Sequence, residues 1–405
     1  MNIIIVGNGV AGITAARIIK EKDPKSNVSV YTEENHHYYP RPRLYDILSG
    51  KAEPHDIYMF SEEWYIKKGI KVHLNKRALR IETEKNELLF EDNSRIHFDK
   101  LLLANGASSF IPPIKGSEKK GTFTLRSIKD ALIIKEYTRK TKKSIIIGGG
   151  LLGLEFASSL RKLGQQVTVV ELFSRLLPRQ LDQDGSKLLN DRISSQGINI
   201  FLGAKTAEII GRKNVSGILL DSGQEISGDL VLISAGVRPN IELASESGIK
   251  VNRGVLVNQN LQTSADDVYA AGDIIEFDGK VYGIIPAALD QANVAAVNII
   301  EKEQKIYNST IPTSTLKVVG VDLKSMGIVN PEEQKYEEIK RIDTHKSIYK
   351  KLVLEKGKIV GAILLGDRKG VTSITKLLAQ ETDIAKYKEK ILNDDFNYKK
   401  IADLT

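Results

Sequence analysis

Two glycine-rich loops have the residue types and spacing that could do chemistry in this sequence. Both read Gly-x-Gly-x-x-Gly, and their glycines are Gly7, Gly9, Gly12, Gly148, Gly150 and Gly153. In such a loop the first glycine permits a tight turn, the second lets a diphosphate approach the backbone, and the third lets a helix pack closely on a strand. The following helix offers free N–H groups and its dipole to negative charge. Each loop therefore predicts a dinucleotide site.

Each loop stands where that mechanism requires it, between a buried strand and a helix, with a second strand beyond. We expect these elements at 2–6, 13–20 and 28–31 around the first loop, and at 144–147, 154–163 and 167–170 around the second. The loops begin 141 positions apart, at 7 and 148, which indicates a duplicated βαβ module. Leu151 and Leu152 belong to the second loop and are included in its predicted site.

Acidic residues end the second strand of each module. Glu33, followed by Glu34, has this place in the first module, and Glu171 has it in the second. A carboxylate here accepts hydrogen bonds from ribose hydroxyls and repels a 2′-phosphate. No arginine directly follows Glu171, which favours NADH over NADPH, although Arg175 is close enough to leave NADPH open.

A third strand-to-turn segment indicates a flavin. Residues 269–273 end in Gly272 and Asp273, and an aspartate after such a turn can bind a ribityl hydroxyl. Two nucleotide sites and this segment suggest a tightly held flavin and an exchangeable nicotinamide. Two other strands end near Gly106 and Gly236, and a helix is expected over about 287–300.

Composition excludes several kinds of chemistry. The 405 residues include no cysteine, which excludes iron–sulfur clusters, redox disulfides and thiol nucleophiles. The six histidines lack metal-ligand spacing, so no metal site is expected. The net charge of +8 comes without a basic arm, so we expect no nucleic acid partner. No long apolar window and no leader are recognised, so we expect no membrane association and a cytoplasmic location.

The order of these segments predicts three domains. The flavin domain is expected at 1–108 and 237–310, the nicotinamide domain at 109–236, and a small α+β domain at 311–405. In the last domain we expect strands near 315–321, 351–355 and 359–365, and a lysine-rich helical tail over 386–400.

Three phrases carry a resemblance to a known family. They are Tyr39-Pro40-Arg41-Pro42-Arg43-Leu44, Arg179-Gln180-Leu181-Asp182 and Leu316-Lys317-Val318-Val319-Gly320. With the glycine loops, they make nearly all of residues 1–330 resemble the glutathione-reductase-like flavoproteins, in the cysteine-free branch of ferredoxin and rubredoxin reductases and apoptosis-inducing factor. The likeness is closest to NADH:rubredoxin oxidoreductases and the N-terminal part of nitrite reductase large subunits. It implies an α/β fold with two Rossmann-like domains plus a small α+β C-terminal domain.

The resemblance implies a set of FAD-binding residues. The first glycine loop would hold the diphosphate, Glu33 the adenosine ribose and Asp273 the ribityl chain, with Arg41 and Arg126 as further contacts. The other implied positions are Glu34, Ala104, Asn105, Gly106, Gly272, Ala287, Ala288 and Leu289. Backbone N–H groups of Ala288 and Leu289 would face the pyrimidine edge of the flavin.

For the reaction itself, the resemblance implies Glu155 beside flavin N5 and Gly236 near the nicotinamide. The lysine that often pairs with this glutamate is replaced by Asp46. Lys317 either reaches the flavin from the C-terminal domain or is a structural lysine.

These features predict an enzyme that passes electrons from NADH through FAD to a small carrier such as rubredoxin. Basic residues near the flavin, Arg41, Arg43, Lys51, Lys317 and Lys324, favour an acidic carrier. The alternatives are an NADH oxidase, an electron donor to a separate nitrite reductase component, and a redox-responsive FAD- and NAD-binding interaction protein. A monomer or a homodimer is expected.

Overall fold

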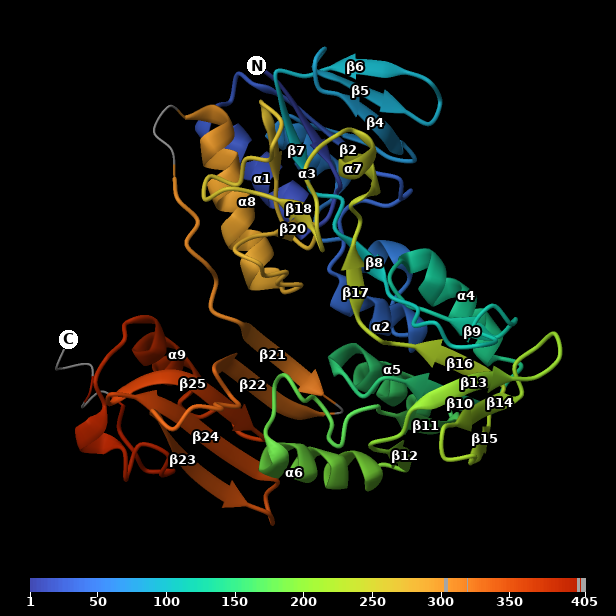
Figure 1. The fold of residues 1–405 in the computed structure, drawn as a ribbon, viewed down its shortest axis with the longest axis vertical. Helices are drawn as coiled ribbons and strands as arrows, with labels where there is room; N and C mark the ends of the chain where they lie inside the picture. The colour runs from blue at the N-terminus through green and yellow to red at the C-terminus, as the bar shows by residue number, and fades with distance from the viewer. Residues whose placement is uncertain (302–304, 319, 399–400, 402–405) are drawn as a thin grey trace. The chain divides into compact units, whose positions relative to one another are not determined.

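The computed structural model describes residues 1–301, 305–318, 320–398 and 401, without the side chains of 316–318. The chain forms two compact units (Figure 1). The first comprises Met1–Phe110, Arg126–Ile128 and Gly236–Pro312, and the second comprises Ile111–Leu125, Lys129–Ala235 and Thr313–Thr405.

The first unit is built on a parallel sheet in the order β19-β7-β1-β2-β3. Its strands are β1 (Asn2–Val6), β2 (Asn27–Tyr31), β3 (Ile70–His73), β7 (Lys100–Leu103) and β19 (Val268–Ala270). The isoleucines of the central strand β1 are fully buried, as expected for a parallel sheet covered on both faces. Helices α1 (Val10–Lys22) and α8 (Ile285–Ile300) pack against each other and contact this sheet.

The second unit contains a matching parallel sheet in the order β12-β11-β10-β16-β9. Its strands are β9 (Thr122–Phe123), β10 (Lys143–Ile147), β11 (Gln166–Val170), β12 (Ile198–Phe201) and β16 (Leu230–Ile233). Helix α5 (Leu151–Lys162) follows β10, and α6 (Gln183–Ser194) precedes β12.

The C-terminal part of the second unit is an antiparallel sheet in the order β21-β22-β25-β24-β23. Its strands are β21 (Thr313–Val318), β22 (Val321–Gly327), β23 (Tyr336–Asp343), β24 (Ile348–Glu355) and β25 (Lys358–Leu365). Helix α9 (Val371–Ala379) packs on it with Ile374 and Leu377 in a shared apolar core.

Shorter elements complete both units. The strands are β4 (Ala78–Glu82), β5 (Glu87–Phe90), β6 (Arg95–His97), β8 (Ala107–Ser109), β13 (Thr206–Ile210), β14 (Gly217–Leu220), β15 (Glu225–Ser227), β17 (Val237–Pro239), β18 (Val255–Leu256) and β20 (Ile275–Glu276). The helices are α2 (Leu44–Leu48), α3 (Glu62–Lys68), α4 (Ile128–Thr138) and α7 (Glu242–Glu246), with 3₁₀ turns η1 (Arg41–Arg43), η2 (Pro54–Ile57) and η3 (Ala385–Tyr387).

The elements predicted around both glycine loops are confirmed, although each helix begins three residues earlier than expected, at Val10 and Leu151. The third glycine of each loop therefore lies inside the first helical turn. The four domain segments stay a prediction.

The C-terminal predictions need three corrections. The strand expected at 315–321 is two strands, β21 and β22, because the chain turns at Gly320 with a φ of 84°. Strand β23 was not predicted at all. The helical tail expected over 386–400 is not found at 388–398, which form turns and irregular backbone because this stretch is rich in Asn and Asp, and whose Ile391 and Leu392 are buried in the core. Residues 386–387 belong to a 3₁₀ turn, and 399–400 lie outside the described residues.

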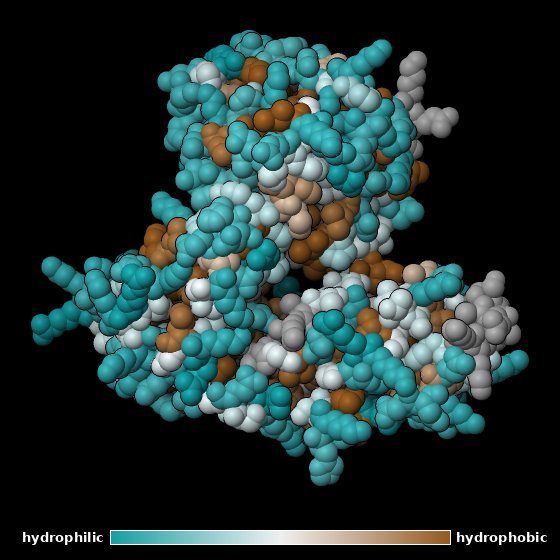
Figure 2. Space-filling model, turned by 180° about the vertical axis from the view of Figure 1, so that it is seen from behind, coloured by the Kyte–Doolittle hydropathy of each residue, from teal (hydrophilic) through white to brown (hydrophobic). Residues whose placement is uncertain are grey.

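Hydrophilic side chains cover much of the face drawn in Figure 2, interrupted by hydrophobic residues. Among the described residues, no helix combines the length and the apolar character that crossing a membrane would require.

Candidate functional site

The first glycine loop, between β1 and α1, is closed on two sides and open at its centre. A Cβ at Gly7, which has a φ of 110°, would lie 2.2 Å from the Ala104 carbonyl oxygen. A Cβ at Gly12 would lie 1.9 Å from the Gly7 carbonyl oxygen. At Gly9, the N-cap of α1, a Cβ would meet no atom within 4 Å. Gly7 and Gly12 are therefore required by packing, whereas Gly9 leaves open space before the helix N-terminus.

The second loop, between β10 and α5, has the same construction. A Cβ at Gly148, with a φ of 115°, would lie 2.3 Å from the Ser234 carbonyl oxygen, and one at Gly153 would lie 2.1 Å from the Gly148 carbonyl oxygen. At Gly150, the N-cap of α5, a Cβ would meet no atom within 4 Å. Each loop thus leaves the N–H groups of a helix N-terminus accessible at its middle glycine, which fits a diphosphate.

The two carboxylates at the strand ends are held differently. Glu171 is 6% exposed and accepts hydrogen bonds from the Gly149 N–H at 2.5 Å and the Phe173 N–H at 2.8 Å. The side chain of Glu33 is 66% exposed, with Arg77 Nε 3.7 Å away. Glu171 is therefore fixed on the edge of the second loop, and Glu33 faces solvent. Arg175 donates to the Pro178 carbonyl oxygen at 3.4 Å.

Four predicted site residues from distant segments meet in the first unit. Arg41 Nη2 pairs with Glu34 Oε1 at 2.6 Å, and Arg41 Nη1 donates to the Arg126 carbonyl oxygen at 2.7 Å. Arg126 Nη2 pairs with Asp273 Oδ2 at 3.0 Å. These contacts connect the residues that follow β2 with the turn that follows β19.

Tyr39 joins this network, although it was not among the predicted site residues. Tyr39 is 5% exposed, its hydroxyl donates to Glu34 Oε2 at 2.5 Å, and the Ile128 N–H donates to that hydroxyl at 3.2 Å. Burial raises the pKa of Tyr39, so the hydroxyl keeps its proton at physiological pH. The sequence signal that could have identified Tyr39 as a site residue was its position two residues before Arg41.

Gln291 on α8 is a second residue that was missed. It is 1% exposed, and its Oε1 accepts the Gly272 N–H at 2.9 Å while its Nε2 donates to Tyr307 at 3.2 Å. A Cβ at Gly272 would lie 2.9 Å from the Ala11 Cβ at the start of α1. The turn that carries Asp273 is thereby fixed beside the first glycine loop.

Asn105 borders the same loop. Its Nδ2 donates to the Asn240 carbonyl oxygen at 3.1 Å, but its Oδ1 is buried without a hydrogen-bond partner. Buried acceptors are normally satisfied, so an unsatisfied one marks a place for a ligand or ordered water. At Gly106, with a φ of 68°, a Cβ would meet no atom within 4 Å. The carboxyl ends of β1, β7 and β19 therefore present a polar cradle that fits a dinucleotide cofactor.

The start of α8 requires one correction. The helix begins at Ile285, earlier than expected, with Pro286 in its first turn. The Ala288 N–H donates to the Ile284 carbonyl oxygen at 3.2 Å, so it is already bonded within the helix, and Leu289 lies one position deeper. The N–H groups left for a ligand at this end are those of Ile285 and Ala287.

Most of the residues predicted for the reaction belong to the second unit, where strand β21 contacts helix α5. Glu155 is half-buried on α5, and Leu151 and Leu152 form the first turn of that helix, in the second unit. Gly236 belongs to the first unit and has a φ of 94°. Lys317 lies in β21, and its side chain is outside the described residues.

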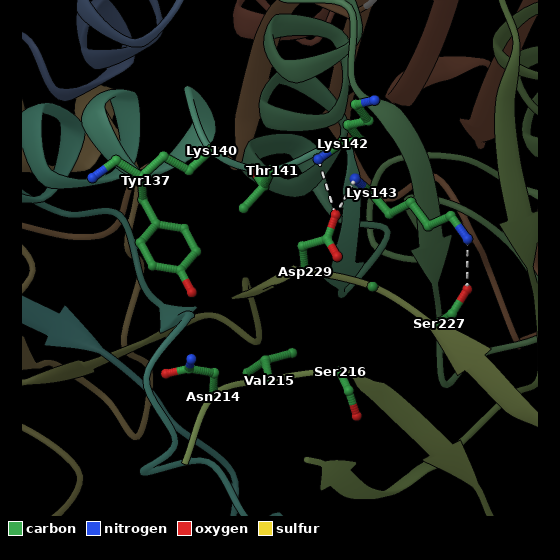
Figure 3. A pocket seen from close by; sticks show the side chains of 11 residues that line it. Tyr137, Lys140, Thr141, Lys142, Lys143, Asn214, Val215, Ser216, Ser227 and Asp229 are labelled. Carbon is green, nitrogen blue, oxygen red and sulfur yellow. Dashed lines mark hydrogen bonds between the residues drawn. The ribbon is translucent and has the colours of Figure 1, made fainter. Parts of the chain in front are cut away.

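A surface pocket of 540 Å³ lies elsewhere in the second unit (Figure 3). Asp229 at its centre accepts the N–H groups of Lys142 and Lys143, both at 2.9 Å, and Lys143 Nζ donates to Ser227 at 3.1 Å. Lys143 is the first residue of β10, directly after Lys142, and Asp229 directly precedes β16, whereas the glycine loop follows the end of β10. Since nucleotides bind at the carboxyl ends of parallel strands, this pocket is not part of the dinucleotide site.

The fold and the two open glycine loops define an α/β oxidoreductase with two dinucleotide sites. Residues 1–296 match the pyridine nucleotide-disulphide oxidoreductase family, and residues 312–382 match the rubredoxin NAD+ reductase C-terminal domain. The chain belongs to the pyridine nucleotide-disulphide oxidoreductase family. The predicted fold class and family are confirmed, and FAD and NAD(H) are the cofactors of this family.

Known proteins of this kind are similar over most of the chain. An NAD(P)H nitrite reductase of Bacillus subtilis (strain 168) is 37% identical over 95% of this chain and 48% of its own length. An NADH-rubredoxin oxidoreductase of Clostridium acetobutylicum is 32% identical over 93% of this chain and 94% of its own. The structure of the ferredoxin reductase for the CYP199A2 system of Rhodopseudomonas palustris superposes with a TM-score of 0.90, at 25% identity over 98% and 99% of the two chains. The chain spans about half the length of the nitrite and nitrate reductase relatives.

Proposed function

We propose that this chain passes electrons from NADH, through bound FAD, to a small one-electron carrier such as rubredoxin. The observation that carries the proposal is the combination, in one chain, of two open glycine loops and a C-terminal domain of the rubredoxin reductase type. The rubredoxin oxidoreductase relative, which matches along nearly its whole length, supports the same acceptor class.

Bound FAD would supply the ability to accept a hydride and release electrons singly. In this proposal the first glycine loop and the α1 N-terminus bind the diphosphate, and the solvent-facing Glu33 binds the adenosine ribose. Asp273 orients the ribityl chain, and its ion pair with Arg126 fixes the position of its carboxylate. In this proposal the buried Oδ1 of Asn105, which has no hydrogen-bond partner, accepts a hydrogen bond from the cofactor.

The second glycine loop and Glu171 bind NADH in this proposal. The diphosphate lies against the α5 N-terminus at Gly150, and Glu171 accepts the adenosine ribose hydroxyls. Glu155 on α5 helps to position the nicotinamide for hydride transfer. Because the sequence contains no cysteine, electrons leave to an external acceptor rather than through a disulfide.

The second candidate is an electron donor to a separate nitrite or nitrate reductase component. It is favoured by the relatives of that kind, in which the similar part makes up about half of the protein. The acidic character of the carrier, the cytoplasmic location and the oligomeric state stay predictions.

Acceptor competition tests the proposal. NADH consumption would be measured with oxidised rubredoxin, with oxygen and with a nitrite reductase component, each at equal concentration. We expect rubredoxin to give the highest rate, by about 10-fold over oxygen, corresponding to about 1.4 kcal/mol in activation free energy. A faster reaction with oxygen would identify an NADH oxidase, and a long-lived NADH–flavin complex without turnover would identify a redox-responsive binding protein.

A further inference from the structure

The segment of residues 172–182, which joins Glu171 to helix α6, packs directly on the second glycine loop. Leu177 donates its N–H to the Gly149 carbonyl oxygen at 3.3 Å. A Cβ at Gly149 would lie 2.7 Å from Leu176 Cδ2 and 3.1 Å from the Glu171 Cβ. The positions of Glu171 and of this loop therefore depend on how the segment is held.

The segment also contains a conformation that its surroundings must maintain. Leu177 is fully buried and has a φ of 50°, in the left-handed region that a leucine rarely adopts. Such a conformation persists only where neighbouring contacts impose it.

Strand β24 of the C-terminal sheet and Asn330, in the loop between β22 and β23, supply such contacts. Asn330 Nδ2 donates to the carbonyl oxygens of Pro178 at 3.1 Å and Leu181 at 3.3 Å. On strand β24, which lies beside α6, the Tyr349 hydroxyl donates to Asp182 Oδ2 at 2.5 Å, and Lys351 Nζ donates to the same oxygen at 3.0 Å. Pro178, Leu181 and Asp182 all lie in the C-terminal half of the segment.

This anchor is buried and fully partnered. The side chains of Asp182 and Lys351 are 9% and 2% exposed, Lys351 also pairs with Glu338 at 2.6 Å, and Asp182 Oδ1 caps α6 by accepting the Gly185 N–H at 3.1 Å. Burial raises the pKa of Tyr349, and its bond to Asp182 raises it further, so the hydroxyl remains a donor. Removing one partner from such a group is costly, because the others stay buried without compensation.

We propose that Asn330, Tyr349 and Lys351 are positioning residues for NADH: they hold residues 172–182, and through them Glu171 and the second glycine loop, in the geometry that binds the adenosine end of the dinucleotide. The proposal rests on the assignment of NADH to this loop. It gives the C-terminal sheet a role in nucleotide affinity, separate from contact with an electron acceptor.

The test compares Tyr349→Phe and Asn330→Ala with Tyr398→Phe, all in the FAD-bound protein. The control removes a tyrosine hydroxyl from the same part of the chain, where it donates to the Ile391 carbonyl oxygen at 2.9 Å and does not contact the segment. NAD+ binding would be measured by calorimetry, and hydrogen exchange of 172–182 would be followed without nucleotide.

Both test variants should weaken NAD+ binding by about 5-fold or more, because Tyr349→Phe removes one hydrogen bond and Asn330→Ala removes two, and both should speed exchange in 172–182. KM for NADH should rise in parallel while kcat is unchanged, and Tyr398→Phe should alter none of these quantities. Unchanged NAD+ affinity in both variants would overturn the positioning role, whether or not exchange increases. Failure of the unmodified protein to bind NAD+ would instead reject the proposed function.

Discussion

Arg126 and Asp273, which are 147 positions apart in the sequence, form an ion pair of 3.0 Å in the first unit. The pair joins the segment that precedes α4 to the turn that follows β19, and its two side chains are about one quarter exposed, 24% and 23%. Arg126 Nε also donates to the Ala107 carbonyl oxygen at 2.9 Å, next to Gly106. One arginine therefore connects two of the strand ends that form the proposed FAD cradle.

Replacing Arg126 by alanine should weaken FAD binding by about 10-fold or more, since it removes charge-assisted hydrogen bonds and leaves Asp273 uncompensated. Flavin content after gel filtration and reconstitution with FAD would measure the loss. Arg139→Ala, which removes an exposed pair with Glu136, is the matched control and should retain FAD. Full flavin content in Arg126→Ala would show that the pair is structural only.

Glu171 should make NADH the better donor by about 10-fold or more, because like charges 4 Å apart repel by roughly 1 kcal/mol in water and more when partly buried. Glu171→Gln should lower the ratio of kcat/KM for NADH to kcat/KM for NADPH. Glu33→Gln, at the corresponding place in the first unit, should leave that ratio unchanged. Equal kcat/KM values for NADH and NADPH in the unmodified protein would contradict the assignment of Glu171 to the adenosine ribose of NADH.

Glu155→Ala should slow NADH-dependent bleaching of the flavin absorbance by about 10-fold or more while FAD stays bound, because a misplaced nicotinamide loses the alignment that hydride transfer requires. Stopped-flow absorbance under nitrogen gives the rate. Glu136→Ala, an exposed change on α4, is the control. An unaltered rate of flavin bleaching in Glu155→Ala would show that Glu155 does not position the nicotinamide.

Electron transfer to an acidic carrier should slow as salt increases from 0.01 to 0.1 M, over which the Debye length falls from about 30 to about 10 Å. The expected decrease is modest, about 3-fold, because Arg41 and Arg43 are already paired with Glu34 and Asp46 at 2.6 and 3.0 Å. NADH-dependent flavin bleaching should change little over the same range. An equal salt response in both half-reactions would show that no basic docking surface contributes.

Local signals account for what the sequence predicted well. A strand, a glycine loop and a helix within 30 residues determine their own geometry, so Gly7–Gly12 and Gly148–Gly153 could be placed from spacing alone. Strand β23 was missed because Glu337, Glu338, Lys340 and Arg341 obscure its apolar pattern, as charges often do on edge strands.

Contacts between distant segments could not be predicted in the same way. Tyr349 and Asp182 are 167 positions apart, and neither residue type nor spacing indicates that they meet. The roles of Tyr39 and Gln291 likewise depend on partners that the fold brings together. The start of α8 was misplaced because helix boundaries depend on capping geometry that the apolar pattern does not contain.

The most direct test of the account is an anaerobic titration of the purified protein. It should be yellow, with about one FAD per chain, and one equivalent of NADH should bleach the flavin absorbance. Two equivalents of oxidised rubredoxin should then restore it, because NADH donates two electrons and each carrier accepts one. A protein that neither contains nor takes up FAD, or one whose bleached flavin is not reoxidised by the carrier, would contradict the account.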